Sequence, residues 1–227
     1  MLAVGRRPIS IPPVSHHQSP HFQNLFIERE EAYFMPSALR TERLELVPAT
    51  PRHLDLDLTD HRALAALLKA EVPPDWPPEM IRDARRTFLS MLRADPFSEG
   101  WNLWYLIRTG GERRVLAGGC GFVGHPSIEG RAEIGYSLMP GCRGRGYATE
   151  AAAALIGWAF DDPDVTCVFA RTYADLTPSI RLLRRLGFTP AGDEEGGIRL
   201  RYDLTRAQWD GTSRWGWKKE DFILAFP

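Results

Sequence analysis

Residues 133–150 read EIGYSLMPGCRGRGYATE, and an alanine-rich run, 151–160, follows them. The pattern predicts a strand, a glycine turn and then a helix. Gly144 and Gly146 stand just before the helix, which allows successive backbone N–H groups to point outward together. The positive end of the helix dipole lies at the same place and attracts an anion. The turn therefore predicts a cradle for a pyrophosphate, and with it a ligand that carries a nucleotide.

The composition indicates an ordinary soluble globular protein. The chain has 227 residues and a formal net charge of −1, so bulk charge gives no reason to expect a nucleic-acid or membrane partner. No apolar run is long enough to span a bilayer, and the N-terminus lacks the pattern of a secretory signal. Three cysteines without C-x-x-C spacing argue against a disulfide framework or a structural zinc site. We therefore expect a cytoplasmic protein that holds no metal.

One ordered domain is expected between two tails. Residues 1–38 contain several prolines and histidines and no sustained apolar period, so we expect a disordered N-terminal extension there. The domain itself is expected over 39–210. The segment 211–227 is rich in aromatic residues and forms a C-terminal tail in this division.

Apolar periodicity predicts the other elements of the domain. Thr50 is expected to cap a helix that begins at Pro51, because threonine accepts from a free N–H and proline suits the first helical position. Strands are expected over 43–48, 101–107, 115–123, 132–138, 165–173 and 198–204, and further helices over 79–94, 148–160 and 179–186.

Four segments in order carry a resemblance to a known family. Residues 133–150, and 179–188, which read SIRLLRRLGF, resemble the GNAT superfamily of acyl-CoA-dependent N-acetyltransferases. Within it, the chain is similar to the branch that contains the ribosomal-protein N-terminal acetyltransferases. Members of that branch begin with a segment like 41–46 and often end with one like 202–205. The resemblance covers about residue 39 to residue 210.

The resemblance implies an α+β fold, also described as a three-layer α/β sandwich, with a mixed and mostly antiparallel sheet, flanking helices and a splayed strand pair. The splayed strands would be 132–138 and 165–173, and acetyl-CoA would enter between them as cosubstrate. Its pyrophosphate would lie on the glycine turn and its pantetheine arm along the end of the preceding strand. The cofactor-binding residues that follow are Ser137, Leu138, Met139, Arg143, Gly144, Arg145, Gly146, Tyr147, Ala148 and Thr149.

The resemblance also implies direct transfer of an acetyl group to a primary amine in a ternary complex. An ammonium ion has no lone pair, so the reaction needs a base, and Glu133 is the candidate. A structural ion pair between Glu133 and an arginine such as Arg131 is an equally good interpretation. Many superfamily members protonate the thiolate from a tyrosine whose position is Leu183 here. Ser179 is then the candidate for that role, and a hydroxyl that bonds the backbone is its alternative.

Other interpretations stay open at this point. A module that binds acyl-CoA without catalysis would keep the cradle and lack the acid. A nucleotide binder of another family is disfavoured, because G-x-x-x-x-G-K-[ST] is absent. Trp76, Trp104 and His125 either line an acceptor pocket or pack structurally. The acceptor is a protein or peptide N-terminus or a small-molecule amine, and a homodimer is compatible with the sequence.

Overall fold

The computed structural model describes residues 36–209. The predicted extension, apart from its last three residues, and the predicted tail therefore lie outside the described residues. One sheet has the strand order β1-β2-β3-β4-β5-β6-β8-β7. Its strands are β1 Leu39–Arg40, β2 Leu44–Pro48, β3 Leu103–Arg108, β4 Val115–Phe122, β5 Arg131–Leu138, β6 Cys167–Tyr173, β7 Thr189–Glu194 and β8 Arg199–Thr205. The helices are α2 Pro51–Thr59, α3 His61–Leu68, α4 Glu79–Ala94, α5 Tyr147–Asp161 and α6 Thr177–Arg185.

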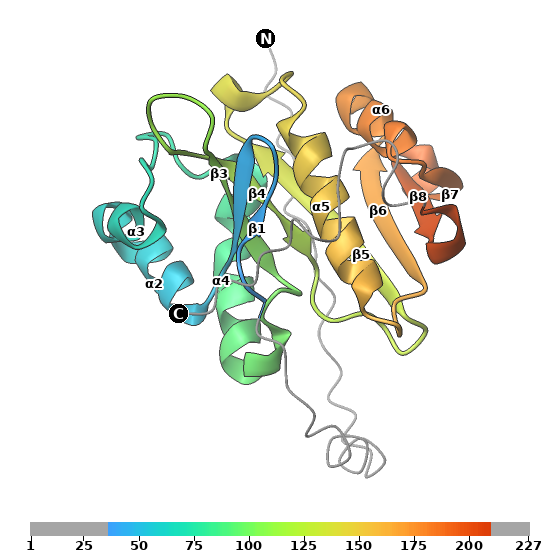
Figure 1. The fold of residues 1–227 in the computed structure, drawn as a ribbon. Coiled ribbons are helices and arrows are strands. Elements are labelled where there is room, and N and C mark those ends of the chain that lie inside the picture. Colours follow the sequence, from blue (N-terminus) through green and yellow to red (C-terminus); the bar gives the residue numbers. More distant parts are fainter. Residues whose placement is uncertain (1–35, 210–227) are drawn as a thin grey trace. The chain divides into compact units, whose positions relative to one another are not determined.

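The centre of the sheet contains a pair of parallel strands that separate. Strands β5 and β6 run parallel and pair only from Arg131–Cys167 to Glu133–Phe169, whereas the other neighbouring strands are antiparallel. Beyond these pairs the two strands diverge (Figure 1). The predicted splayed pair and the mostly antiparallel α+β sheet are thereby confirmed.

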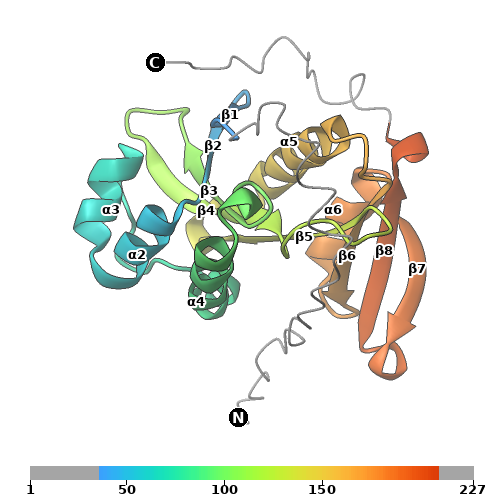
Figure 2. The same ribbon diagram turned by 90° about the horizontal axis from the view of Figure 1, so that it is seen from below.

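Helices cover the sheet on two sides and divide its core (Figure 2). In β3, Trp104 and Leu106 belong to the cluster that includes α5 and α6, whereas Leu103, Tyr105 and Ile107 belong to the cluster with α2, α3 and α4. Side chains of a strand alternate between faces, so β3 is buried on both of them. Its uninterrupted apolar run has this physical cause.

A buried carboxylate ties the second helical layer to the sheet. Asp57 on α2 is 0% exposed. It accepts hydrogen bonds from Trp76 Nε1 at 2.8 Å, from the Tyr105 hydroxyl at 2.9 Å and from Arg85 Nη1 at 2.8 Å. A buried charge needs such partners, because the desolvation of one ion costs on the order of several kcal/mol in folding free energy. The network joins α2, α4 and β3.

Helices α2 and α4 start at the predicted residues, whereas strands β1 and β7 were not predicted. Thr50 caps α2, and its Oγ1 accepts from the backbone N–H of His53 at 3.3 Å. Of the two strands that were not predicted, β1 has only two residues, and β7 contains Pro190 and Gly192 and is mostly exposed. A register shift falls between Pro190 and Gly192. Proline is tolerated there because β7 lies at the edge of the sheet, where its missing donor breaks no ladder.

Candidate functional site

The glycine turn leaves the end of β5 and enters α5 with its backbone exposed. A short 3₁₀ turn, Pro140–Cys142, follows β5. Gly144 and Gly146 have φ angles of 73° and 82°, a left-handed conformation that favours glycine. The first helical bond runs from Glu150 N–H to Gly146 O at 3.0 Å. The N–H groups of residues 147–149 therefore precede the intrahelical ladder and are oriented for an anion.

A tertiary contact that the sequence did not reveal holds this turn. The carboxylate of Glu150 accepts from Thr41 Oγ1 at 2.5 Å, from Arg43 N at 2.9 Å and from Arg43 Nε at 2.7 Å. Arg43 Nη1 also donates to the carbonyl of Arg145 at 2.9 Å. The Arg43 guanidinium lies 4.9 Å from the centre of the Tyr147 ring. The segment between β1 and β2 thus fixes both sides of the predicted cradle.

The predicted cofactor residues fall into exposed and buried groups. Residues 143–146 are exposed, and Arg143 Nε donates to the carbonyl of Leu138 at 3.1 Å. The side chains of Leu138, Met139, Tyr147 and Thr149 are buried, so these residues would meet a ligand through their backbone. Ser137 and Ala148 are half-buried.

The end of β5 also offers an unpaired backbone edge. Because β6 pairs with β5 only over residues 131–133, the β6-facing edge of 134–138 has no strand partner in the part of the chain that the structure describes. On β6, the buried Oγ1 of Thr172 has no hydrogen-bond partner among the described residues. Both features suit an extended ligand with amide groups, such as a pantetheine arm.

Glu133 lies at the last pair before the strands diverge. Its neighbours Ala132 and Ile134 belong to the cluster under α5, so Glu133 points to the opposite face. Its Oε2 is 2.5 Å from Arg171 Nη1. Burial raises the pKa of Glu133, while the charges of Arg171 and Arg199 oppose this rise. A half-buried carboxylate whose pKa is raised has the properties of a general base.

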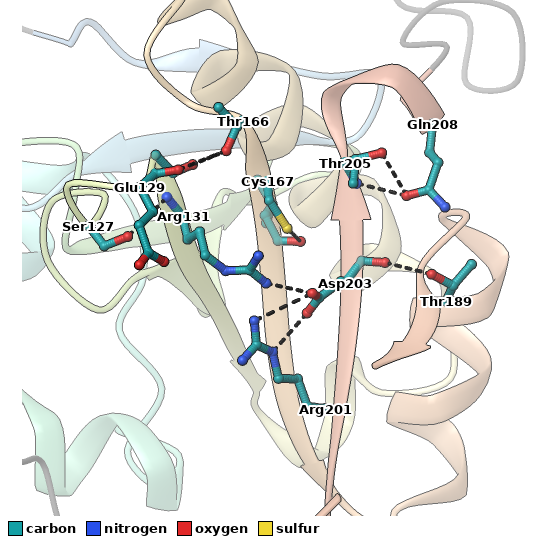
Figure 3. A network of polar contacts seen from close by, with 12 residues as sticks. Ser127, Glu129, Arg131, Thr166, Cys167, Thr189, Arg201, Asp203, Thr205 and Gln208 are labelled. Atoms are coloured by element: carbon teal, nitrogen blue, oxygen red, sulfur yellow. Dashed lines mark hydrogen bonds and ion pairs between the residues drawn. The ribbon is translucent and has the colours of Figure 1, made fainter. Parts of the chain in front are cut away.

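The ion-pair interpretation of Glu133 named the wrong arginine. Arg131 pairs with Asp203 on β8, with Nη2 and Oδ2 2.5 Å apart (Figure 3). Arg171 pairs with Glu133 and, through Nε, with Glu194 at 3.0 Å. Strand register explains the difference, because the neighbours of a residue in a sheet come from adjacent strands.

Ser179 meets a side chain rather than the backbone. Its Oγ lies 2.8 Å from the hydroxyl of Tyr136. Tyr136 belongs to the diverging part of β5, and Ser179 lies in the first turn of α6, which follows β6. Burial raises the pKa of Tyr136 to about 12. Leu183, at the position of the usual tyrosine, is a core residue with 1% exposure.

Of the remaining candidates, Trp76 and Trp104 pack in the core, whereas His125 is partly exposed and pairs with an acidic side chain. Trp76 is buried and bonds to Asp57, and Trp104 is fully buried in the core. His125 Nε2 lies 3.2 Å from Asp95 Oδ2. Across residues 36–209, no three His, Cys, Asp or Glu side chains gather as a metal site, and no helix is both long and apolar enough to cross a membrane.

Comparisons with known proteins agree with this architecture. The acetyltransferase (GNAT) domain family matches residues 43–189. The uncharacterized N-acetyltransferase YjdG of Bacillus subtilis (strain 168) is 32% identical over 151 residues, which are 66% of this chain and 88% of YjdG. The crystal structure of an acetyltransferase from Agrobacterium tumefaciens str. C58 has a TM-score of 0.51 and 26% identity, over 78% of this chain and 99% of its own.

A structure of the ribosomal L7/L12 alpha-N-protein acetyltransferase RimL in complex with coenzyme A has a TM-score of 0.52. It is 19% identical and covers 78% of this chain and 99% of its own, a likeness that shows the fold alone. The family match spans more than half of the chain, and YjdG, at 32% identity, is matched over 88% of its own length. The chain therefore belongs to the GNAT family and is an N-acetyltransferase.

Proposed function

We propose that this chain transfers the acetyl group of acetyl-CoA to a primary amine by direct attack in a ternary complex. The observation that carries the proposal is the divergence of β5 from β6 just after Glu133 and just before the glycine turn. A ligand that follows the free edge of β5 would have a phosphate cradle at one end and a carboxylate at the other. Acetyl-CoA has the chemistry for this path, because its pyrophosphate, amides and thioester follow one another in this order.

The donor would be held mainly by backbone groups. Residues 143–149 would bind the pyrophosphate through N–H groups, with Arg143 and Arg145 adding charge. Residues 137–139 would line the pantetheine arm, and the hydroxyl of Thr172, which has no partner among the described residues, would give it a further polar contact. This division explains why exposed glycines and buried side chains occur together in the cradle.

Side chains on both faces of the sheet flank the place where the thioester would lie: Glu133 on one face, and Tyr136 with Ser179 on the other. Glu133 points away from α5, whereas Tyr136 packs against the cluster that includes α5 and α6. Ser179 approaches from α6. Glu133 would take a proton from the amine nitrogen, directly or through a water, as the new N–C bond forms. Ser179 would face the sulfur as the C–S bond breaks and its electron pair moves to sulfur.

The face beside Glu133 supports a polar acceptor without strong net charge. The ring of Phe169 on β6 is flanked by the guanidinium groups of Arg131, Arg171 and Arg201, which lie 5.7, 5.1 and 4.7 Å from its centre. Acidic partners neutralise all three, namely Asp203, Glu133 and Glu194. A protein or peptide N-terminus and a small-molecule amine both fit this surface.

A thiol-release assay with acetyl-CoA and a panel of N-terminal peptides and small amines tests the proposal. We expect CoA release that depends on the amine, and an acetylated amine of the expected mass. Binding of CoA is measured separately by thermal shift, with ATP and NAD as controls. Tight CoA binding with no amine-dependent release across the panel would instead support a module that binds acyl-CoA without catalysis.

A further inference from the structure

A hydrogen bond between two hydroxyls crosses the divergence of β5 and β6. The Tyr136 hydroxyl and Ser179 Oγ lie 2.8 Å apart. Tyr136 stands on β5 three residues beyond the last residue that pairs with β6. Ser179 stands on α6, which follows the C-terminal end of β6. The bond therefore joins the two walls between which the thioester would lie.

The chemistry of the two hydroxyls favours Tyr136 as the donor in this bond. A phenol is more acidic than an aliphatic hydroxyl and is the stronger donor of the two. Burial raises the pKa of Tyr136 to about 12, so the phenol keeps its proton at neutral pH. A neutral phenol at 2.8 Å can donate to Ser179 Oγ. Because a serine hydroxyl both accepts and donates, its own O–H stays available for a third group, and the first bond strengthens the second.

We propose that Tyr136 is a positioning residue that acts through Ser179: its phenol donates to Ser179 Oγ and thereby aims the serine O–H at the sulfur of the thioester. The inference rests on the proposed function. When the C–S bond breaks, sulfur receives the electron pair, and Ser179 stabilises the thiolate with a hydrogen bond. The amine proton passes to Glu133, and the thiolate takes a proton from solvent on release. Tyr136 loses no proton in this sequence.

The surroundings explain why this chain would use such a pair. Leu183 occupies the place where many relatives would have a tyrosine, and it is buried in the core. A lone serine hydroxyl rotates among several orientations, only some of which reach the sulfur. A fixed phenol on the opposite wall removes part of that freedom.

A double-mutant cycle separates this role from a structural one. Tyr136→Phe and Ser179→Ala are each expected to lower kcat about tenfold, the effect of one lost hydrogen bond near 1.4 kcal/mol. If Tyr136 acts through Ser179, the double variant is no slower than Ser179→Ala alone. Tyr202→Phe, at a buried tyrosine of β8 in the same core cluster, is the control and keeps kcat. If Tyr136→Phe lowered kcat by a further tenfold in the Ser179→Ala background, the proposal would be overturned.

A second measurement needs no acceptor. The thiol of bound CoA is titrated by the ultraviolet absorbance of its thiolate, with desulfo-CoA as the blank. A donor at the sulfur favours the thiolate, so Tyr136→Phe and Ser179→Ala should each move the titration to higher pH, with no additional shift in the double variant. An unchanged titration in Tyr136→Phe, with CoA still bound, would refute the inference while leaving the proposed function intact. If the wild-type protein did not bind CoA, both the inference and the proposed function would be overturned.

Discussion

The carboxylate of Glu150 accepts a hydrogen bond from the backbone N–H of Arg43 at 2.9 Å, although 107 positions separate the two residues. The guanidinium of Arg43 contacts the same carboxylate, with Nη2 at 2.6 Å. Arg43 also donates to the carbonyl of Arg145 within the glycine turn. The geometry of the cradle therefore depends on a contact with the segment just before β2, outside the glycine motif itself.

Glu150→Gln should loosen this contact. The variant keeps the size of the side chain but leaves the Arg43 guanidinium without its charge partner, so we expect a loss of about 2 kcal/mol in the free energy of unfolding and weaker CoA binding. Urea unfolding and CoA titration measure the two effects. Glu112→Gln, in an exposed loop, is the control. If Glu150→Gln unfolded with the wild-type free energy, the Arg43–Glu150 pair would make no net contribution to stability.

The conformation of the turn predicts different effects of alanine at three exposed glycines. Gly144 and Gly146 have positive φ, so an alanine at either costs about 1 kcal/mol or more, and Cβ at 146 would also lie 3.3 Å from Arg43 Nη2. Gly141 has open space and no positive φ. We expect weaker CoA binding for Gly144→Ala and Gly146→Ala and little change for Gly141→Ala. Equal affinities in all three variants would argue against the cradle.

Replacing Glu133 tests its role as the base. Glu133→Gln should lower kcat by ~100- to 10,000-fold, the usual contribution of a general base, while CoA still binds. Glu194→Gln is a matched control, because Glu194 also contacts Arg171 but lies on β7. If both variants lose activity equally, the ion-pair network rather than a base accounts for the effect.

The pH dependence of the rate follows from the surroundings of Glu133. The base works only when it is ionised, so kcat/KM should fall as pH drops through its raised pKa. Arg171 lowers this pKa, and Arg171→Gln removes that influence, so the acidic limb should move to higher pH. Arg201→Gln, which also lies against Phe169 but pairs with Asp203, should leave the limb in place. If Arg171→Gln left the acidic limb of the kcat/KM profile in place, Glu133 would be excluded as the titrating group.

Two aspartates on one helix should differ sharply in their effect on stability. Asp57 is fully buried and carries three side-chain hydrogen bonds, whereas the side chain of Asp55 is 47% exposed in its pair with Arg93. Asp57→Asn leaves the Arg85 charge buried without a counter-ion and should cost about 3 kcal/mol. Asp55→Asn should cost less than about 1 kcal/mol. Urea unfolding of both variants checks the contrast, which equal losses would contradict.

Much of the fold could be predicted because it depends on neighbours along the chain. Helix α4 occupies the predicted range, and β2 and β5 lie within one residue of theirs. Side-chain periodicity and turn residues act over a few positions, so they can be recognised from neighbouring residues in the sequence. Strand β7 was missed for the converse reason: its proline and glycine disfavour a strand locally, and only pairing with β8 stabilises it.

The sequence by itself determined the strand, the glycine turn and the helix of the cradle, and through the order of four segments the family. Only the tertiary structure decided which charges and hydroxyls meet. Glu133 pairs with Arg171 rather than Arg131, and Tyr136 meets Ser179, because the pairing of β5 with β6 brings these residues together. Strand order and register decide which residues far apart in the chain become neighbours, and a local pattern of residue types does not specify these contacts.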